Sequence, residues 1–406
     1  MCCLILVQIK NDILPTTKVE YVMLNATLRV IKKIARKFIA FGTKRKNDRI
    51  LLLQESHSGS NTYALFNLVS DKLNKKYEII LLCESEPSTL IDFVKKHALL
   101  ASAKLIITTH ASYKPSNKNI HFQLWHGPFV KKNGIMVPEE SKNMLSSRSS
   151  WRKADYIMSY SETYTTFMNA CMVTHPSKYI ISGAPRNDLL LLSDGKSNMK
   201  KIYGDKIKGY KTILFMPTFR KNSNVNRISK SIDRLFGFDQ FSLEKFDQFL
   251  EINNCKLIFK LHPHSEETVL RLFDDYSLNN LLILKNEDLV KNSLDLYELI
   301  NATEMLITDY SSVFYDYLLI DRPMIFTPTD INSYQQDRGF VIESFASWAP
   351  GPKALTQDEL HVEIKKCLLD KNYYADKRTW LRDLNHRYKD GNSSERLWSF
   401  IDSIMS

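Results

Sequence analysis

The feature that most constrains the fold of this chain is an alternation of short apolar runs, typical of β-strands, with runs of helical spacing. From Arg49 the strand-like runs are "RILLLQ", "YEIILLC", "AKLIIT" and "IHFQLW", and the helical ones include "NTYALFNLVSDKLN" and "STLIDFVKKHALL". Strands that alternate with helices pair in parallel through right-handed crossovers. The sequence therefore predicts an α/β sheet that continues through "KYIISG" to about Leu192.

The alternation stops and then starts again, which predicts a second lobe. The polar stretch "SDGKSNMKKIYGDKIKGY" is interpreted as a linker near Gly195 to Gly209. After it, "KTILFMP", "KLIFKLHP", "LLILK", "EMLITDYSS" and "PMIFTP" have the pattern of strands, and "SLEKFDQFLEINN" and "SLDLYELINA" that of helices. We predict an N-terminal segment (1–48), an N-terminal α/β lobe (49–200) and a C-terminal α/β lobe with further helices (201–406). In the last helix "NSSE" predicts Asn392 as the N-cap.

Composition places the chain among globular proteins. With 44% hydrophobic and 25% charged residues over 406 positions, it can bury two cores of ordinary size. The six cysteines lack metal-type spacing, which favours free thiols in a reducing cytoplasm. Neither a run of about 20 apolar residues nor a signal-peptide pattern is present, so we expect a protein that stays inside the cell.

The net charge of +11 is concentrated near the N-terminus, where nine Lys or Arg lie between residues 29 and 49. Apolar residues recur there at helical spacing: Leu24, Leu28, Ile31, Ala35, Phe38 and Phe41. The pattern predicts an amphipathic helix on an anionic membrane surface. The residues expected at the headgroups are Arg29, Lys32, Lys33, Arg36 and Lys37. A solvated helix covering the domain's own core is the alternative. Nucleic acid is disfavoured because aromatic RNA-binding signatures are absent.

Unusual polar residues follow the predicted strands of the first lobe, at the edge where open α/β sheets bind ligands. "QLWHGP" places His126 and Gly127 after a strand, with Lys131 and Lys132 just beyond. An imidazole can take a proton near neutral pH, and a glycine allows close approach of a ligand. The alternative is a structural histidine in a turn.

"ISGAPRND" is a second such strand end, and it contains Gly183, Pro185, Arg186 and Asp188. The planar guanidinium of Arg186 suits phosphate or carboxylate. A helix entry in which Arg186 pairs with Asp188 is equally consistent with the pattern.

Three strand ends of the second lobe carry the remaining candidates. "MPTFRK" contains Thr218 and Arg220, "KLHPHSEE" contains His262 and His264, and "LITDYSSVFYDY" contains Asp309, Ser311 and Ser312. The two histidines have the wrong spacing for a metal and are interpreted as presenting an imidazole to an anion. The two serines are predicted to cap the following helix and to offer hydroxyl and N–H groups to a phosphate.

Several chemistries are excluded by missing motifs. GxxxxGK[ST] is absent, as are a GxGxxG that follows a strand, GxSxG, and an Asp-x-Asp metal pair. What remains is a cleft between two α/β lobes that suits a diphosphate without a protein-held metal, and we expect no cofactor.

In combination these motifs resemble a known family. "WHGP", "GAPRND", "PTFRK", "KLHPH" and "TDYSSVFYDYLLIDRP", followed by "DRGF" and "DGNSSER", resemble the CDP-glycerol glycerophosphotransferases of teichoic acid and capsule synthesis. The resemblance implies a GT-B fold with two Rossmann-like lobes facing a central cleft, the nucleotide on the C-terminal lobe, and a peripheral position on the cytoplasmic face of the bacterial membrane. It also implies that the WHG and HP histidines, here His126 and His262, are the functional pair. Relatives commonly continue WHG with Thr-Pro, whereas this chain has Pro128 and Phe129.

The function predicted from this resemblance is transfer of glycerol phosphate from CDP-glycerol to a hydroxyl of a lipid-linked saccharide or growing polymer, releasing CMP. His126 would act as general base and His262 would stabilise the departing CMP. The expected donor-binding residues are Gly183, Pro185, Arg186, Asp188, Thr218, Arg220, His264, Asp309, Ser311 and Ser312, and the acceptor side is Gly127, Lys131 and Lys132. The alternatives are a CDP-ribitol phosphotransferase, a GT-B glycosyltransferase using a nucleotide sugar, and a non-catalytic membrane-surface or nucleic-acid-binding protein.

Overall fold

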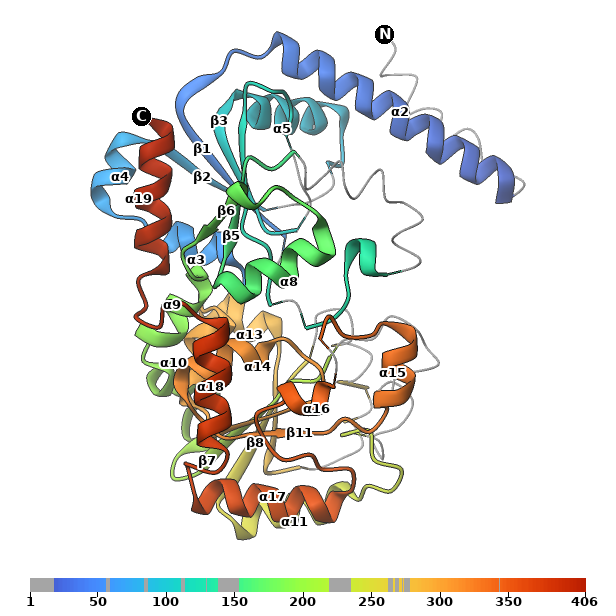
Figure 1. Ribbon diagram of the computed structural model, residues 1–406, viewed down its shortest axis with the longest axis vertical. Coiled ribbons are helices and arrows are strands. Elements are labelled where there is room, and N and C mark those ends of the chain that lie inside the picture. Colours follow the sequence, from blue (N-terminus) through green and yellow to red (C-terminus); the bar gives the residue numbers. More distant parts are fainter. Residues whose placement is uncertain are drawn as a thin grey trace.

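A computed structural model shows two α/β lobes, one above the other in Figure 1, each built on a parallel sheet. The structure describes residues 18–55, 59–83, 87–110, 114–128, 130–137, 153–218, 235–261, 266, 270, 271, 273, 278–342 and 344–406. The predicted α/β class and its division into two lobes are confirmed.

The N-terminal lobe has a six-stranded sheet in the order β2-β1-β3-β4-β5-β6. The strands are β1 (Lys46–Gln54), β2 (Glu78–Cys83), β3 (Ala103–Thr108), β4 (Ile120–Gln123), β5 (Tyr156–Ser159) and β6 (Tyr179–Ile181). Its helices include α3 (Asn61–Asn67), α4 (Asp71–Lys76), α5 (Leu90–Ser102), α8 (Glu162–Met172) and the 3₁₀ turns η1 (Gly134–Met136) and η2 (Pro176–Lys178). Both faces of β1 are buried, because Leu51 packs in one core cluster while Ile50 and Leu52 pack in another. Burial on both faces is typical of a parallel sheet.

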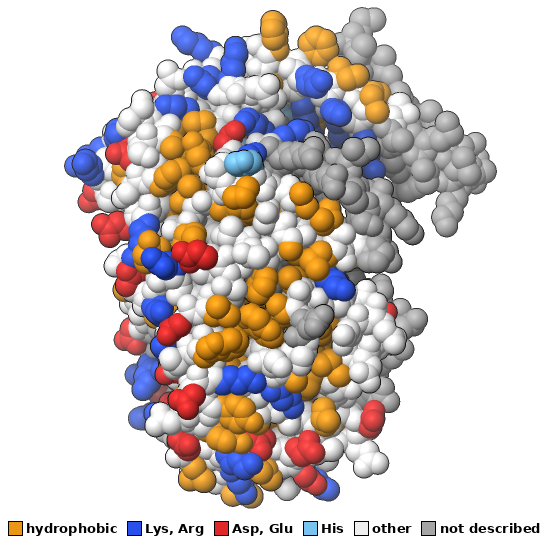
Figure 2. Space-filling model, viewed as in Figure 1, with side chains coloured by type: hydrophobic (Ala, Val, Ile, Leu, Met, Phe, Trp, Pro, Cys, Tyr) orange, Lys and Arg blue, Asp and Glu red, His pale blue; other side chains and the backbone are white. Residues whose placement is uncertain are grey.

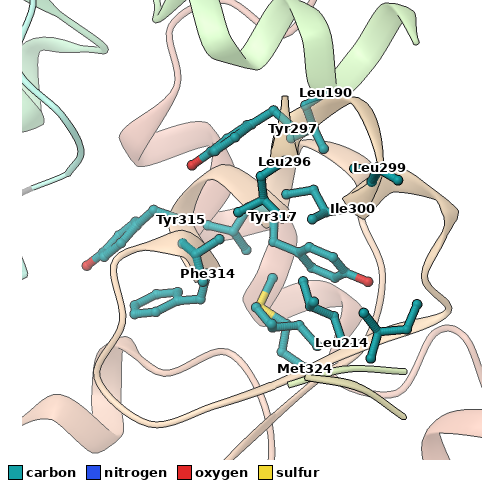
Figure 3. Packing of buried hydrophobic residues seen from close by; sticks show 14 of the residues in the cluster. Leu190, Leu214, Leu296, Tyr297, Leu299, Ile300, Phe314, Tyr315, Tyr317 and Met324 are labelled. Atoms are coloured by element: carbon teal, nitrogen blue, oxygen red, sulfur yellow. The ribbon is translucent and has the colours of Figure 1, made fainter. Parts of the chain in front are cut away.

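The C-terminal lobe has a five-stranded sheet in the order β11-β10-β7-β8-β9. The strands are β7 (Lys211–Phe215), β8 (Cys255–Lys260), β9 (Leu281–Leu284), β10 (Met305–Thr308) and β11 (Met324–Phe326). Its helices include α11 (Leu243–Ile252), α13 (Asn286–Lys291), α14 (Val313–Tyr317), α15 (Ile331–Asp337), α16 (Phe345–Trp348), α17 (Gln357–Leu369) and the turn η7 (Leu318–Ile320). Figure 3 shows one face of this lobe, where Tyr317 and Met324 lie near Leu214 of β7, and Leu190 lies beside Tyr297 in the same cluster.

The connection between the lobes is helical where a linker was predicted. The chain forms α9 (Pro185–Leu192), α10 (Gly195–Tyr203) and the turn η3 (Gly204–Ile207). Met199 of α10 is fully buried in the core of the C-terminal lobe, and this packing holds a segment whose polar composition suggested a loop.

The predicted helix "SLDLYELINA" is corrected by the structure to two 3₁₀ turns, η5 (Leu296–Glu298) and η6 (Ile300–Ala302). The carboxylate of Asp295 accepts hydrogen bonds from the N–H groups of Tyr297 at 2.8 Å and Gly59 at 2.7 Å. A tertiary contact therefore decides the local geometry, and the helical spacing of the apolar residues does not.

The C-terminal helices divide between the lobes. α18 (Ala375–Asn385) runs beside the C-terminal lobe, and α19 (Ser393–Met405) crosses back to the N-terminal lobe, where Figure 1 shows it close to α4. Leu397, Trp398 and Ile401 lie in the core of the N-terminal lobe, and the indole N–H of Trp398 donates to the carbonyl of Leu65 at 2.9 Å. The last helix of the predicted C-terminal unit (201–406) therefore packs in the N-terminal lobe.

The N-terminal helix α2 (Lys18–Gly42) extends from the N-terminal lobe in Figure 1 and packs against α5. Its side chains are described from Thr27, so the side chain of Leu24 lies outside the described residues. The predicted apolar stripe is divided in the structure. Leu28, Ile31 and Ala35 are partly covered, whereas the exposed apolar residues of α2 are Val30, Ile34, Phe38 and Phe41. Within the described residues, no helix is both long and apolar enough to span a bilayer.

Candidate active site

The backbone of the WHG motif is held by buried side chains. Three consecutive carbonyl groups each accept a hydrogen bond: Trp125 from Asn61 Nδ2 at 2.9 Å, His126 from Arg186 Nη1 at 2.6 Å, and Gly127 from the Tyr164 hydroxyl at 2.8 Å. Trp125 has a φ of 56°, which is uncommon for a bulky residue and persists only where neighbours enforce it. The structure thus fixes the position from which His126 projects.

The imidazole of His126 is exposed, yet protein surrounds it closely. Its ring centre lies 4.3 Å from that of His110, with near-parallel planes, and 4.1 Å from that of Trp125. Burial lowers the pKa of His126 well below its ordinary value, and the positive charge of Arg186, or of His110 when it is protonated, acts in the same direction. Its ring is therefore unprotonated at neutral pH, which is the form a general base requires.

Arg186 of the N-terminal side contacts residues of the C-terminal lobe. Its guanidinium forms an ion pair with the fully buried Asp316 of α14, and lies 4.8 Å from the ring centre of Tyr297. The Tyr297 hydroxyl donates to the same Asp316 carboxylate at 2.7 Å. This geometry corrects the alternative pairing, because Arg186 pairs with Asp316 and not with Asp188; its role in donor binding stays a prediction.

Asp188, also predicted to bind the donor, is buried as the cap of α19. Its carboxylate accepts the N–H groups of Ser393 at 2.9 Å and Ser394 at 2.6 Å, while Asn392 makes no side-chain capping bond. Asn392 is the N-cap residue of α19, as predicted, but its side chain does not cap the helix, because Asp188, some two hundred positions away, supplies the acceptor.

Gly183 and Pro185 also serve the packing of this region. Gly183 has a φ of +77°, and a Cβ there would lie 2.5 Å from the Ser393 hydroxyl, so the close approach of α19 requires glycine. Pro185 is buried at the first position of α9, where its missing N–H costs nothing. Their assignment to donor binding stays a prediction.

Asp309, at the carboxyl end of β10, organises the neighbouring strand end. Its Oδ1 accepts the N–H of Thr218 at 2.8 Å and that of Tyr310 at 2.5 Å. Thr218 follows β7, which pairs with β10 in the sheet. The buried carboxylate thus holds the "MPT" turn in place, and Asp309 acts as a positioning residue.

Ser311 and Ser312 follow Asp309 and are half-exposed. Ser312 is the N-cap residue of the short helix α14, as predicted, but its hydroxyl makes no capping bond. Across the lobes, a Cβ on Gly127 would lie 3.2 Å from the Ser312 hydroxyl and 3.2 Å from Arg186 Nη2. The glycine of the WHG motif therefore allows the serine motif of the other lobe to come within contact distance.

The predicted acceptor-side lysines lie at the same junction. Lys131 donates from Nζ to the Thr218 hydroxyl at 3.2 Å and forms an antiparallel bridge with Phe340. The backbone N–H of Lys132 donates to the carbonyl of Gly339 at 3.2 Å. The "DRGF" segment thus docks the chain after His126 onto the C-terminal lobe.

Three candidates, Arg220, His262 and His264, lie outside the described residues. The described strand β8 ends at Lys260, two residues before His262. The Lys260 ammonium group donates to Asn286 Oδ1 at 2.8 Å and to the Leu261 carbonyl at 3.0 Å. The described end of β8 is therefore anchored by a buried lysine.

Comparison with known proteins identifies the family of this chain. The model of the CDP-Glycerol:Poly(glycerophosphate) glycerophosphotransferase family matches residues 32–403. The chain belongs to this glycerophosphotransferase family.

Curated relatives of the family differ in length. The ribitol-phosphate polymerase TarL of Staphylococcus aureus is 27% identical over 379 residues, which cover 87% of this chain and 62% of the relative. The teichoic acid glycerol-phosphate primase of Bacillus subtilis is 27% identical over 377 residues, which cover 87% of this chain and 89% of the relative. The chain therefore spans less than two thirds of the first relative and most of the second.

Solved structures confirm the predicted GT-B arrangement of the family's fold. The wall teichoic acid polymerase TagF superimposes with a TM-score of 0.75 at 20% identity, covering 94% of this chain and 95% of that one. A UDP-N-acetylglucosamine 2-epimerase from Listeria monocytogenes gives a TM-score of 0.51 at 12% identity, covering 88% and 96%. At these identities the likeness concerns the fold alone.

Sequence reasoning missed several residues of the candidate site. His110 follows β3 and Glu55 follows β1, so the rule of polar groups at strand ends that selected His126 would also have selected them. Asn61, Tyr164 and Asp316 carry no comparable local signal, because their roles depend on partners in other elements.

Proposed function

We propose that this chain transfers glycerol phosphate from CDP-glycerol to a hydroxyl of a teichoic acid polymer or its lipid-linked precursor, with release of CMP. The observation that carries the proposal is the contact between the WHG and serine motifs, where Gly127 meets Ser312 beside the exposed imidazole of His126. Family membership supports the donor class, and one TagF structure is of a variant soaked with CDPG.

His126 acts as the general base in this mechanism. The acceptor oxygen attacks the phosphorus that bears glycerol, the bond from that phosphorus to the CMP oxygen breaks, and His126 takes the acceptor proton. General-base catalysis contributes roughly 10²- to 10⁴-fold to the rate. The position of the imidazole suits this role because the carbonyls of three consecutive residues around it are held.

The donor diphosphate is held by hydroxyl and N–H groups of the C-terminal lobe. Ser311 and Ser312 supply half-exposed hydroxyls, and Asp309 fixes the turn that carries Thr218. Arg220, His262 and His264 stay predictions of diphosphate contacts. Phosphoryl transfer depends mainly on such positioning and charge stabilisation.

The test is CMP release from CDP-glycerol in the presence of a lipid-linked acceptor. His126→Ala is expected to lose about a hundredfold or more in rate. His175→Ala removes an exposed histidine at η2 and serves as the matched control. Full CMP release by His126→Ala would contradict the proposal.

CDP-ribitol is the second candidate donor, because a ribitol-phosphate polymerase and a glycerol-phosphate primase are equally identical to this chain, at 27%. A panel of CDP-glycerol, CDP-ribitol and UDP-sugars separates these activities and the glycosyltransferase alternative. Consumption of UDP-sugars with no release of CMP would overturn both phosphotransferase assignments.

We also propose that α2 attaches the protein to the cytoplasmic face of the bacterial membrane, as a peripheral protein. Val30, Ile34, Phe38 and Phe41 recur every three or four residues, and Phe38 and Phe41 are 74% and 93% exposed. In Figure 2, apolar and basic side chains lie side by side along this helix. The basic residues expected at the headgroups are Arg29, Lys32, Lys33, Arg36 and Lys37. Such a surface suits anionic lipid.

Co-sedimentation with vesicles tests this attachment. The wild type should bind vesicles that contain phosphatidylglycerol and bind neutral phosphatidylcholine vesicles weakly, and Phe38→Asp with Phe41→Asp should release it. Leu369→Asp is the matched control, since that leucine is 87% exposed on α17. Equal binding by the double variant and the wild type would contradict the proposal.

A further inference from the structure

Two groups beside His126 have no part in the reaction described so far. Glu55 follows β1 and His110 follows β3, neighbouring strands of the N-terminal sheet. The Nδ1 of His110 lies 2.9 Å from the Glu55 carboxylate. The ring of His110 stacks on that of His126 with a centre distance of 4.3 Å and an angle of 6°. Glu55, His110 and His126 thus form a continuous series of contacts.

The groups around His126 and His110 determine whether each imidazole carries a proton. Arg186 and Lys131 disfavour a proton on His126, as a proton on His110 would, and a hydrogen bond with the backbone of Thr109 favours one. Burial lowers the pKa of His110, Glu55 opposes that shift and Arg186 adds to it. His110 is therefore neutral at neutral pH, and the Glu55–His110 pair carries the negative charge of the carboxylate.

We propose that Glu55, acting through the stacked His110, is a positioning residue that supplies negative charge to offset the imidazolium formed on His126. The inference rests on the proposed role of His126 as general base. In that step the acceptor O–H bond breaks, the oxygen bonds to phosphorus, the P–O bond to CMP breaks with its electron pair, and the proton goes to His126.

No proton passes from His126 to His110 in this proposal. The two rings are stacked, so their N–H groups lie in nearly parallel planes and do not point at one another. The contribution of Glu55 and His110 is therefore electrostatic and orientational, and the proton on His126 leaves to solvent after the transfer.

Glu55→Gln is the first test, because glutamine keeps the size and the hydrogen-bonding oxygen but loses the charge. The kcat for CMP release should fall about threefold to tenfold, with the KM for CDP-glycerol unchanged. The acid limb of the kcat/KM profile should move to lower pH, since His126 becomes a weaker base. A merely structural role would leave that limb in place. An unchanged kcat with an unshifted profile would overturn the inference.

His110→Phe is the second test, because phenylalanine keeps the stacked ring and loses the link to Glu55. Its effect should match that of Glu55→Gln, and the double variant should lose no more than the larger single effect. If the losses multiply in the double variant, Glu55 and His110 act independently, which would contradict their proposed action as one unit. Glu162→Gln, an exposed carboxylate on α8 paired with Arg387, is the control and should keep wild-type kinetics.

The outcome for His126→Ala separates the two proposals. If that variant keeps full activity, the proposed function fails. If it is inactive while Glu55→Gln and His110→Phe behave as wild type, the general base stands and the role of Glu55 is refuted.

Discussion

The two sides of the site differ in how their polar groups are employed. On the N-terminal side, the backbone around His126 is bound by Asn61, Arg186 and Tyr164. On the C-terminal side, the hydroxyls of Ser311 and Ser312 are half-exposed, and neither bonds to the part of the chain that the structure describes. In the proposed mechanism, the base that must meet a proton in one geometry is preorganised, while the hydroxyls proposed to bind the diphosphate are left available to the ligand.

The largest loss of stability is expected from removing a side chain that holds the backbone around His126. Arg186→Met should lower the free energy of unfolding by about 3–5 kcal/mol, because it leaves the buried Asp316 carboxylate unpaired. Urea unfolding measures the loss. Arg387→Met, whose guanidinium is exposed, is the control and should change little.

The double variant Arg186→Met with Asp316→Leu sharpens this result. Replacing both partners by apolar residues should restore much of the stability, since no charge stays buried alone. CMP release should stay low, because the carbonyl of His126 has lost its donor. Recovery of activity together with stability would show that Arg186 only holds the fold.

A smaller loss is expected from Asp188→Ala. Removing this acceptor uncaps α19, which should cost about 1–2 kcal/mol of unfolding free energy. Asp194→Ala removes the cap of α10 at an exposed position and is the matched comparison, with a smaller loss. A raised KM for CDP-glycerol with unchanged stability would instead support Asp188 as a donor-binding residue.

On the C-terminal side, Ser311→Ala with Ser312→Ala should affect binding and leave folding intact. Loss of two hydrogen bonds to the diphosphate should raise the KM for CDP-glycerol about tenfold. The unfolding midpoint should not move, and Ser403→Ala is an exposed control. A lowered unfolding midpoint with a normal KM for CDP-glycerol would mean that these hydroxyls stabilise the fold and do not bind the donor.

The smallest effect concerns pH. Because the pKa of His126 is lowered, the free base persists as pH falls through the usual range of histidine. The wild-type kcat/KM should therefore stay nearly constant between about pH 8 and pH 6 and fall only below that interval. A half-maximal point at about pH 6.5 or higher would mean that the base has an ordinary pKa.

Local patterns predicted part of this molecule well. The strands of both sheets and the strand-end positions of His126, Asp309 and Ser312 follow from apolar runs and their interruptions. The departures share a cause. The segment predicted as a linker forms α10, the segment predicted as one helix forms η5 and η6, and α19 is capped by Asp188. Each of these outcomes is decided by contacts with distant residues.

The sequence by itself determined which residues stand at the carboxyl ends of parallel strands, because burial on both faces of a sheet leaves a local apolar signature. Only the tertiary structure decided what those residues do. Arg186 and Asp316 lie 130 positions apart and Asp188 and Ser393 lie 205 apart, and no periodicity encodes such pairs. Buried charges and unsatisfied helix ends must find partners, and folding alone brings those partners within reach.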